Sequence, residues 1–196
     1  MSTFTENFRK QFDILKDQEM YFKGDMRNVE YFAKNPKNDN KDEIRLKISA
    51  INNHEINDND ALEAMTEHIV KLNIDKRLTA NDLNIVEDIA NITVKGKQMR
   101  LLNFASVYCN YHKPDVYPIY GKGEHREIAR RYIKEQNLNV NPDQLDRYLV
   151  MKQVLDDIIK RFLGDKEINY LEARKFGWLY LDKVIRETQA QEAAAK

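Results

Sequence analysis

Apolar residues recur at every third or fourth position along almost the whole chain, and this spacing limits the folds that it can adopt. Phe4, Phe8 and Phe12 show the pattern near the start of the sequence. Such a period places apolar side chains on one face of an α-helix, where they can pack against other helices. The sequence therefore predicts an all-α fold, a compact multi-helix domain of about seven to nine helices without a substantial sheet.

The helices are expected over residues 5–22, 26–34, 61–72, 79–90, 97–111, 123–136, 141–163 and 167–186. Thr79 and Asp82 have the spacing of a capping box, and Asn141 followed by Pro142 is typical of a helix start. Residues 91–96 are expected to form a turn. Residues 43–51 alternate like a strand, but nothing else in the chain would pair with them, so a helix is favoured there.

Charge and cysteine content exclude several classes of protein. The 196 residues include 32 Lys and Arg and 32 Asp and Glu, so binding to nucleic acid requires a local basic patch. A single cysteine, Cys109, excludes an internal disulfide framework and is typical of a reducing cytoplasm. No apolar run reaches the length of a membrane span, and residues 1–10 lack the apolar core of a signal peptide. We therefore expect a cytoplasmic protein with no membrane partner.

One stretch, NFASVYCNYHKPDVYPIYG at residues 103–121, carries a family resemblance. It resembles the F-A-S-K-Y-x-x-x-H-x-P-x-x-x-P-I-Y pattern of bacterial proteins described as 8-oxoguanine DNA glycosylase-like. RKFGWLYLDKV, which starts at Arg174, resembles their closing helix. The resemblance implies a helix-hairpin-helix DNA glycosylase-like fold and DNA as partner. It divides the chain into an N-terminal helical part (1–78), a glycosylase-like part (79–188) and a tail (189–196) that resembles a helical spacer.

The residues that catalyse glycosidic cleavage in such enzymes are an acid just past the proline corner and a lysine nucleophile one helix earlier. Here Gly121 stands at the acid position and Val107 at the lysine position. Lys97 and Glu124 are the nearest replacements, and neither is at the matching position. We therefore expect a divergent or non-catalytic DNA-binding module. Two alternatives stay open: an active base-excision glycosylase with relocated catalytic residues, and a helical interaction or structural protein.

Basic residues recur every fourth position from residue 122 to residue 134, which predicts a stripe along one helix. The stripe consists of Lys122, Arg126, Arg130 and Lys134. Gly121 and Gly123 precede this helix and leave backbone N–H groups open at its N-terminus, where a phosphate could bind. The sequence therefore predicts weak DNA binding at these six residues. The alternative is an ordinary solvated face, because Glu124, Glu127 and Glu135 offset the charge.

Aromatic and histidine side chains around the proline corner could form a pocket that stacks on a base, or could pack as core, and packing is favoured. They are Tyr108, His112, Tyr117, Tyr120 and His125. Cys109 and His112 share a helix face, but no second pair of ligands has zinc spacing, so no metal and no cofactor are expected. The residues expected to be buried are Phe104, Tyr108, Ile119, Ile128, Phe176 and Trp178.

Overall fold

The computed structural model describes residues 23–51, 55–121, 123–164 and 168–179, with isolated positions 6, 10, 11, 13, 14, 186, 187, 190, 191, 193 and 194. Within these ranges only the backbone is described for residues 124, 128, 131, 135, 162, 163, 178 and 179. Most of the helix expected at 5–22, residue 122, the end of the last helix and the tail at 189–196 lie largely outside the described residues. The described part of the chain is helical apart from one β-hairpin, which confirms the all-α class in its coarse form.

The chain divides into two compact units, which we call the 24–120 unit (Gly24–Tyr120) and the 121–196 unit (Gly121–Lys196, together with Met1–Lys23). The boundary expected after residue 78 falls inside the 24–120 unit. None of the helices within the described ranges is both long and apolar enough to cross a membrane.

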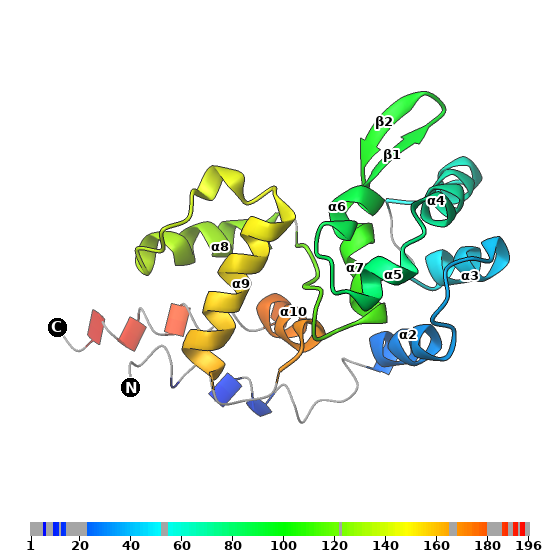
Figure 1. Cartoon of the computed structure of the whole chain (residues 1–196). Coiled ribbons are helices and arrows are strands. Elements are labelled where there is room, and N and C mark those ends of the chain that lie inside the picture. Colours follow the sequence, from blue (N-terminus) through cyan, green and yellow to red (C-terminus); the bar gives the residue numbers. More distant parts are fainter. Residues whose placement is uncertain are drawn as a thin grey trace. The chain divides into compact units, whose positions relative to one another are not determined.

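The 24–120 unit is built around helix α7 (Leu102–His112), which lies among the other helices of this unit in Figure 1. The remaining elements are α2 (Lys23–Lys34), α3 (Lys41–Ile51), α4 (Asn59–Leu72), α5 (Asp75–Thr79), α6 (Ile85–Ala90), β1 (Asn91–Val94) and β2 (Lys97–Arg100). Helix α7 packs against α6 and α3, and α4 packs against α3, α6 and β1. Almost every side chain of α7 is buried, so this helix forms the centre of the core.

Residues 43–51 form a helix, as favoured from the sequence. The Asn40 Oδ1 accepts hydrogen bonds from the backbone N–H groups of Asp42 and Glu43, at 2.8 and 3.1 Å, and so caps α3. Ile44 and Ile48 are buried one turn apart, whereas Leu46 between them is 59% exposed. The apparent alternation was therefore produced by an exposed leucine, and the helical period is the one that burial follows.

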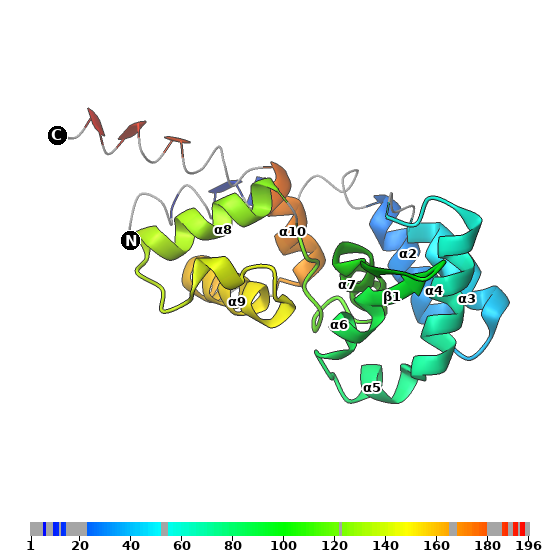
Figure 2. The same ribbon diagram turned by 90° about the horizontal axis from the view of Figure 1, so that it is seen from above.

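Residues 91–100 form an antiparallel β-hairpin, so the expectation of a turn followed by a helix from Lys97 is wrong. Lys95 and Gly96 both have positive φ, 49° and 76°, as a two-residue type I′ turn requires. Ile92 and Val94 alternate with exposed residues on β1, and β1 packs against α4. The hairpin extends away from the helices of its unit in Figure 1, whereas in Figure 2, seen from above, it lies across that unit with β1 next to α4. In this short segment the turn geometry and the burial of Ile92 and Val94 favour a hairpin over the helix that the apolar spacing predicted.

The helix start expected at Thr79 is also wrong. Thr79 ends α5 instead of opening a helix, and its hydroxyl donates to the Asp75 carbonyl oxygen at 2.9 Å. Asp82 pairs with Arg77, at 2.7 Å between Oδ2 and Nε, so it does not serve a capping box. The next helix, α6, begins only at Ile85. The pair joins residues only five positions apart, and the Asp82 Oδ1 accepts from the Asn84 N–H at 3.0 Å, so Asp82 serves the start of α6 and not a helix that opens at Thr79.

The 121–196 unit contains α8 (Glu124–Glu135), the short 3₁₀ helix η2 (Pro142–Gln144), α9 (Tyr148–Leu163) and α10 (Tyr170–Leu179). The expected helix at 123–136 is confirmed as α8. Asn141 does cap a helix start, since its side chain accepts from the Asp143 N–H, but only η2 follows and α9 begins at Tyr148. Helix α8 packs against α9 and η2, and Tyr170 of α10 accepts a 2.6 Å hydrogen bond from Lys152 of α9.

The predicted core is confirmed where side chains are described. Phe104, Tyr108 and Ile119 are buried in the 24–120 unit, and Phe176 is buried in the 121–196 unit. The side chains of Ile128 and Trp178 lie outside the description.

Candidate functional site

The polar side chains of α7 hold the proline corner, residues 113–120, against the helix. The Asn103 Nδ2 donates to the Tyr120 carbonyl oxygen at 2.6 Å, and the Tyr120 N–H donates to the Ser106 Oγ at 2.8 Å. One turn further on, the Asn110 Nδ2 donates to the Tyr117 carbonyl oxygen at 2.7 Å. Three polar side chains of α7 thus form hydrogen bonds with the backbone of the proline corner. This structural role accounts for them without a substrate.

The tyrosines that could either form a base-binding pocket or pack as core lie in the core of the 24–120 unit, the alternative that was favoured. Tyr108, Tyr117 and Tyr120 are at most 4% exposed. The Tyr117 hydroxyl donates to the Asp82 carbonyl oxygen at 3.4 Å, and Tyr108 bonds inside the core as described below. Burial raises the pKa of Tyr117, so this hydroxyl stays protonated. His125, the fifth residue of the set, belongs to the 121–196 unit.

Positions 121 and 123 are occupied by glycine for different structural reasons. A Cβ atom placed on Gly121 would lie 2.5 Å from the Cβ and Cγ atoms of His125, so any larger residue there would displace that ring. Gly123 precedes α8 with φ 58° and makes no side-chain cap to the helix. An acidic side chain at position 121, as the glycosylase pattern has there, therefore has no room while His125 keeps this place.

Three cationic side chains follow successive turns of α8. Arg130 and Lys134 are exposed and Arg126 is half-buried, whereas Ala129, Tyr132 and Ile133 are buried on the other side of the helix. The acidic neighbour among the described side chains is Glu127, 75% exposed, whose Oε2 lies 3.4 Å from the Arg130 Nη1. An exposed pair at this distance contributes little, so Arg130 remains available to an anion. The other predicted cation, Lys122, lies outside the described residues.

The two catalytic candidates, Lys97 and Glu124, belong to different units of the chain. Lys97 is exposed on β2 and belongs to the 24–120 unit, and Glu124, at the first residue of α8, belongs to the other unit. Val107, at the position of the lysine in the glycosylase pattern, is buried in the core. The side chain of Glu124 is not described.

A buried polar network centred on Asn38 was missed from the sequence. The Asn38 Oδ1 accepts hydrogen bonds from the Lys47 Nζ at 3.1 Å, the Tyr108 hydroxyl at 2.5 Å and the His112 Nε2 at 3.2 Å. The Asn38 Nδ2 donates to the Asp75 Oδ1 at 2.7 Å. The network joins Asn38 to α3, nine residues away, and to α5 and α7, which lie 37 to 74 residues away. The signal that could have revealed it is a lysine on the apolar face of α3.

Burial sets the charge of the groups in this network. Lys47 is fully buried, and desolvation lowers the pKa of its amine to about 8, against the opposing effect of nearby carboxylates such as Glu43. Burial and the neighbouring Lys47 lower the pKa of His112 to about 3, so its ring is neutral. The pKa of Tyr108 is raised well above its ordinary value by burial. Near neutral pH the network therefore contains a neutral imidazole, a protonated phenol and a lysine close to losing its proton.

Cys109 is fully buried beside this network, and burial raises the pKa of its thiol. His112 points to Asn38 and not to a shared ligand with Cys109. Among the described side chains, no three His, Cys, Asp or Glu residues are grouped closely enough to hold a metal ion.

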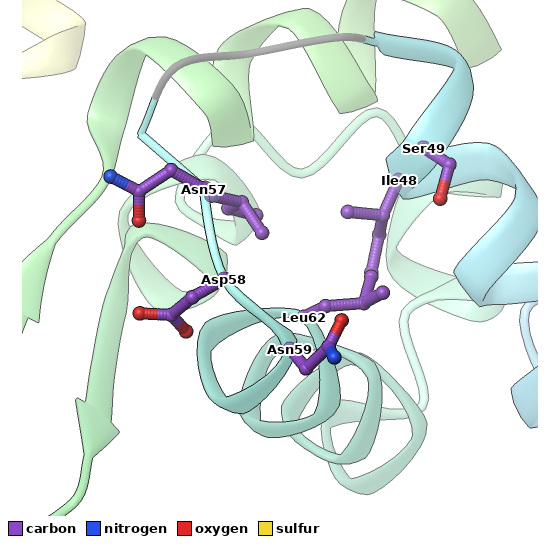
Figure 3. A pocket seen from close by; sticks show the side chains of 7 residues that line it. Ile48, Ser49, Asn57, Asp58, Asn59 and Leu62 are labelled. Carbon is purple, nitrogen blue, oxygen red and sulfur yellow. The ribbon is translucent and has the colours of Figure 1, made fainter.

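A surface pocket of about 240 Å³ lies between the end of α3 and the start of α4 (Figure 3). Ile48, Ile56 and Leu62 supply its apolar part, and its polar residues include Ser49, Asn57 and Asn59. The Asp58 carboxylate also lines it, and its Oδ1 caps α4 by accepting from the Ala61 N–H at 2.8 Å. The pocket therefore offers neutral polar groups, with its described carboxylate already used by the helix.

Comparison with known proteins identifies the family of the chain. A Haemophilus influenzae protein described as uncharacterized is 34% identical over 61 residues, which are 31% of this chain and only 30% of that protein. No solved structure matches the chain. Residues 7–116, more than half of the 196-residue chain, match the family HI_0787_N, described as an N-terminal domain. This match ends near the boundary between the two units, and the chain belongs to the HI_0787_N family.

Proposed function

We propose that the protein is a weak, non-catalytic DNA-binding module that holds the phosphate backbone on α8. The observation that carries the proposal is the row formed by Arg126, Arg130 and Lys134 on successive turns of a helix whose opposite face is buried. A spacing of one turn keeps cations along one line, and such a line can follow consecutive phosphates.

The start of α8 supports the same reading. Gly123 provides no side-chain cap, and the N–H groups of Arg126 and Glu127 both bond to the Gly123 carbonyl oxygen. The N–H groups before them stand at the positive end of the helix dipole, where a phosphate oxygen is favoured. Phosphate would therefore meet backbone donors first and the arginines further along the helix.

The proposal is for binding without base excision. Val107 and Gly121 stand where the glycosylase pattern has its lysine and its acid. Val107 is buried, and Gly121 is packed against His125. Borohydride trapping on lesion-containing DNA tests the enzymatic alternative, because a covalent adduct would indicate an active glycosylase in place of a non-catalytic module.

We also propose that the protein is cytoplasmic, a location that suits a chain whose single cysteine is free and buried.

Fluorescence anisotropy with duplex and single-stranded oligonucleotides at two salt concentrations tests the binding. We expect weak binding that falls as salt rises, and the double variant Arg126→Gln/Arg130→Gln should flatten the dependence of log K on log salt by about two, since each phosphate contact contributes about 0.9. Charge-matched control substitutions are Lys71→Gln and Lys76→Gln, both exposed in the 24–120 unit, and they should leave the slope unchanged.

Glu127→Gln provides a test in the opposite direction. This exposed carboxylate is the described acidic neighbour of Arg130, so its removal should tighten binding to the same oligonucleotides. Absence of binding at low salt to either type of oligonucleotide would remove the proposal and favour a helical interaction protein.

A further inference from the structure

The amine of Lys47 and the side-chain amide of Asn38 touch inside the 24–120 unit, sealed from solvent. The Nζ–Oδ1 distance is 3.1 Å, and Lys47 and Asn38 are 0% and 2% exposed. Because a C=O bond is about 1.23 Å long, the Asn38 Cγ lies no more than about 4.3 Å from the amine. We propose that Lys47 and Asn38 join in an intramolecular isopeptide bond, formed by the protein itself with release of ammonia. This modification is independent of DNA binding.

The carbonyl of Asn38 is arranged as an electrophile. The orientation of its amide follows from the network, because Nδ2 faces two acceptors, the Asp75 Oδ1 at 2.7 Å and the Pro36 carbonyl oxygen at 3.2 Å. Oδ1 accepts from Tyr108 at 2.5 Å and from the His112 Nε2 at 3.2 Å, in addition to Lys47. These two donors point at the oxygen on which negative charge develops when an amine adds to Cγ, as the donors of an oxyanion hole do.

The nucleophile is held in surroundings that favour its reactive, neutral form. Lys47 is fully buried in the core, and desolvation lowers the pKa of the amine to about 8. A fraction of the amine is therefore unprotonated near neutral pH, and the Lys37 carbonyl oxygen at 2.7 Å and the Asn38 Oδ1 fix its position. A reactant held in contact with its partner gains the rate of an intramolecular reaction.

The carboxylate of Asp75 completes the set of groups. Its Oδ1 accepts from the Asn38 Nδ2, and its Oδ2 accepts from the Asn38 backbone N–H at 3.1 Å. It therefore positions the amide and stands beside the nitrogen that must leave, where it can relay a proton.

The reaction balances without an oxidant or a further reactant. The neutral Lys47 Nζ donates its lone pair to the Asn38 Cγ and forms the new C–N bond, while the carbonyl electrons move to Oδ1. One proton then passes from Nζ to Nδ2 by way of the Asp75 carboxylate. The Cγ–Nδ2 bond breaks, the carbonyl re-forms, and ammonia leaves with that proton. The product is a secondary amide between the two side chains, and its oxygen keeps the same donors.

Intact-mass spectrometry of the purified full-length protein is the direct test. After incubation near the Lys47 pKa, the mass should be lower than the sequence mass by one ammonia. Peptide mapping then locates the loss. Trypsin cleaves after Lys37, Lys41 and Arg45 but not after an acylated Lys47, so peptide 38–41 should be recovered linked to the peptide that runs from residue 46 to residue 71.

Three variants separate this bond from other losses of ammonia. Lys47→Arg removes the nucleophile and Asp75→Asn removes the relay, so both should retain the full mass, with circular dichroism reporting whether each is folded. Lys41→Arg, at an exposed lysine, should lose ammonia as the wild type does. A wild-type protein that keeps its full mass overturns the proposal, because the network is then held by hydrogen bonds alone. A loss that persists in Lys47→Arg overturns it as well, because the ammonia then comes from another side chain.

Discussion

Replacing Ser106 with alanine tests whether the polar side chains of α7 hold the proline corner in place. Ser106 is fully buried, and its Oγ accepts from the Tyr120 N–H and donates to the Asn103 carbonyl oxygen, both at 2.8 Å. Alanine removes the hydroxyl but nearly conserves the volume, so the cavity contribution is small. A buried N–H that loses its acceptor costs about 1–3 kcal/mol, and we expect the free energy of unfolding to fall by that amount.

Urea unfolding followed by far-ultraviolet circular dichroism measures this change, and an unaltered slope with denaturant shows that the compactness of the states is conserved. Ser49→Ala is the matched control, because Ser49 is exposed on α3 and should change stability by less than about 0.5 kcal/mol. If Ser106→Ala changes stability as little as this control does, the corner is held by apolar packing and the argument from the hydrogen bonds is refuted.

Three further outcomes follow from the 24–120 unit. Phe32→Ala should lower the unfolding free energy by about 3–5 kcal/mol in urea titrations, because Phe32 is fully buried. Its ring packs edge to face with Tyr108, at 5.3 Å between centroids, and a cost below about 2 kcal/mol would contradict this packing. Glu55→Ala should cost about 1 kcal/mol in the same titrations, because the Glu55 Oε2 accepts from the Phe104 N–H in the first turn of α7; Glu55→Gln should recover part of it. His112 has a folded-state pKa lowered to about 3, so the protein takes up a proton on unfolding and its stability should fall as pH drops below about 6.5. In thermal melts, the stability of His112→Gln should depend less on pH than that of the wild type. An equal dependence on pH would exclude His112 as the cause.

Helical periodicity alone determined much of the fold. Helix α8 follows the expected range because its buried positions, such as Ala129, Tyr132 and Ile133, and its cations repeat on opposite sides of one helix. These are local properties, since residues three and four apart share a helix face whatever lies beyond them. The course of the basic row was predictable for the same reason.

The β-hairpin and the displaced helix starts depended on more than periodicity. Lys95 and Gly96 adopt positive φ, and a lysine there is not a strong turn signal, so the strands became evident only with Ile92 and Val94 packed beside α4. Asp82 had the spacing of a cap for a helix from Thr79, but it pairs with Arg77, five residues earlier, and accepts from the Asn84 N–H just before α6. The hairpin is a short segment with few local interactions, so its packing against α4 is enough to decide its conformation.

The tertiary structure alone decided the environment of Asn38. Its partners Asp75, Tyr108 and His112 lie 37, 70 and 74 residues further along the chain, and nothing in the spacing of an exposed-looking Asn-Asp-Asn segment indicates that they meet. The sequence favoured a helix over residues 43–51, and in that helix Lys47 shares the buried side with Ile44 and Ile48. Only the packed core removes water from that amine and brings it against the amide, because desolvation and contact are properties of the folded unit and not of any one segment.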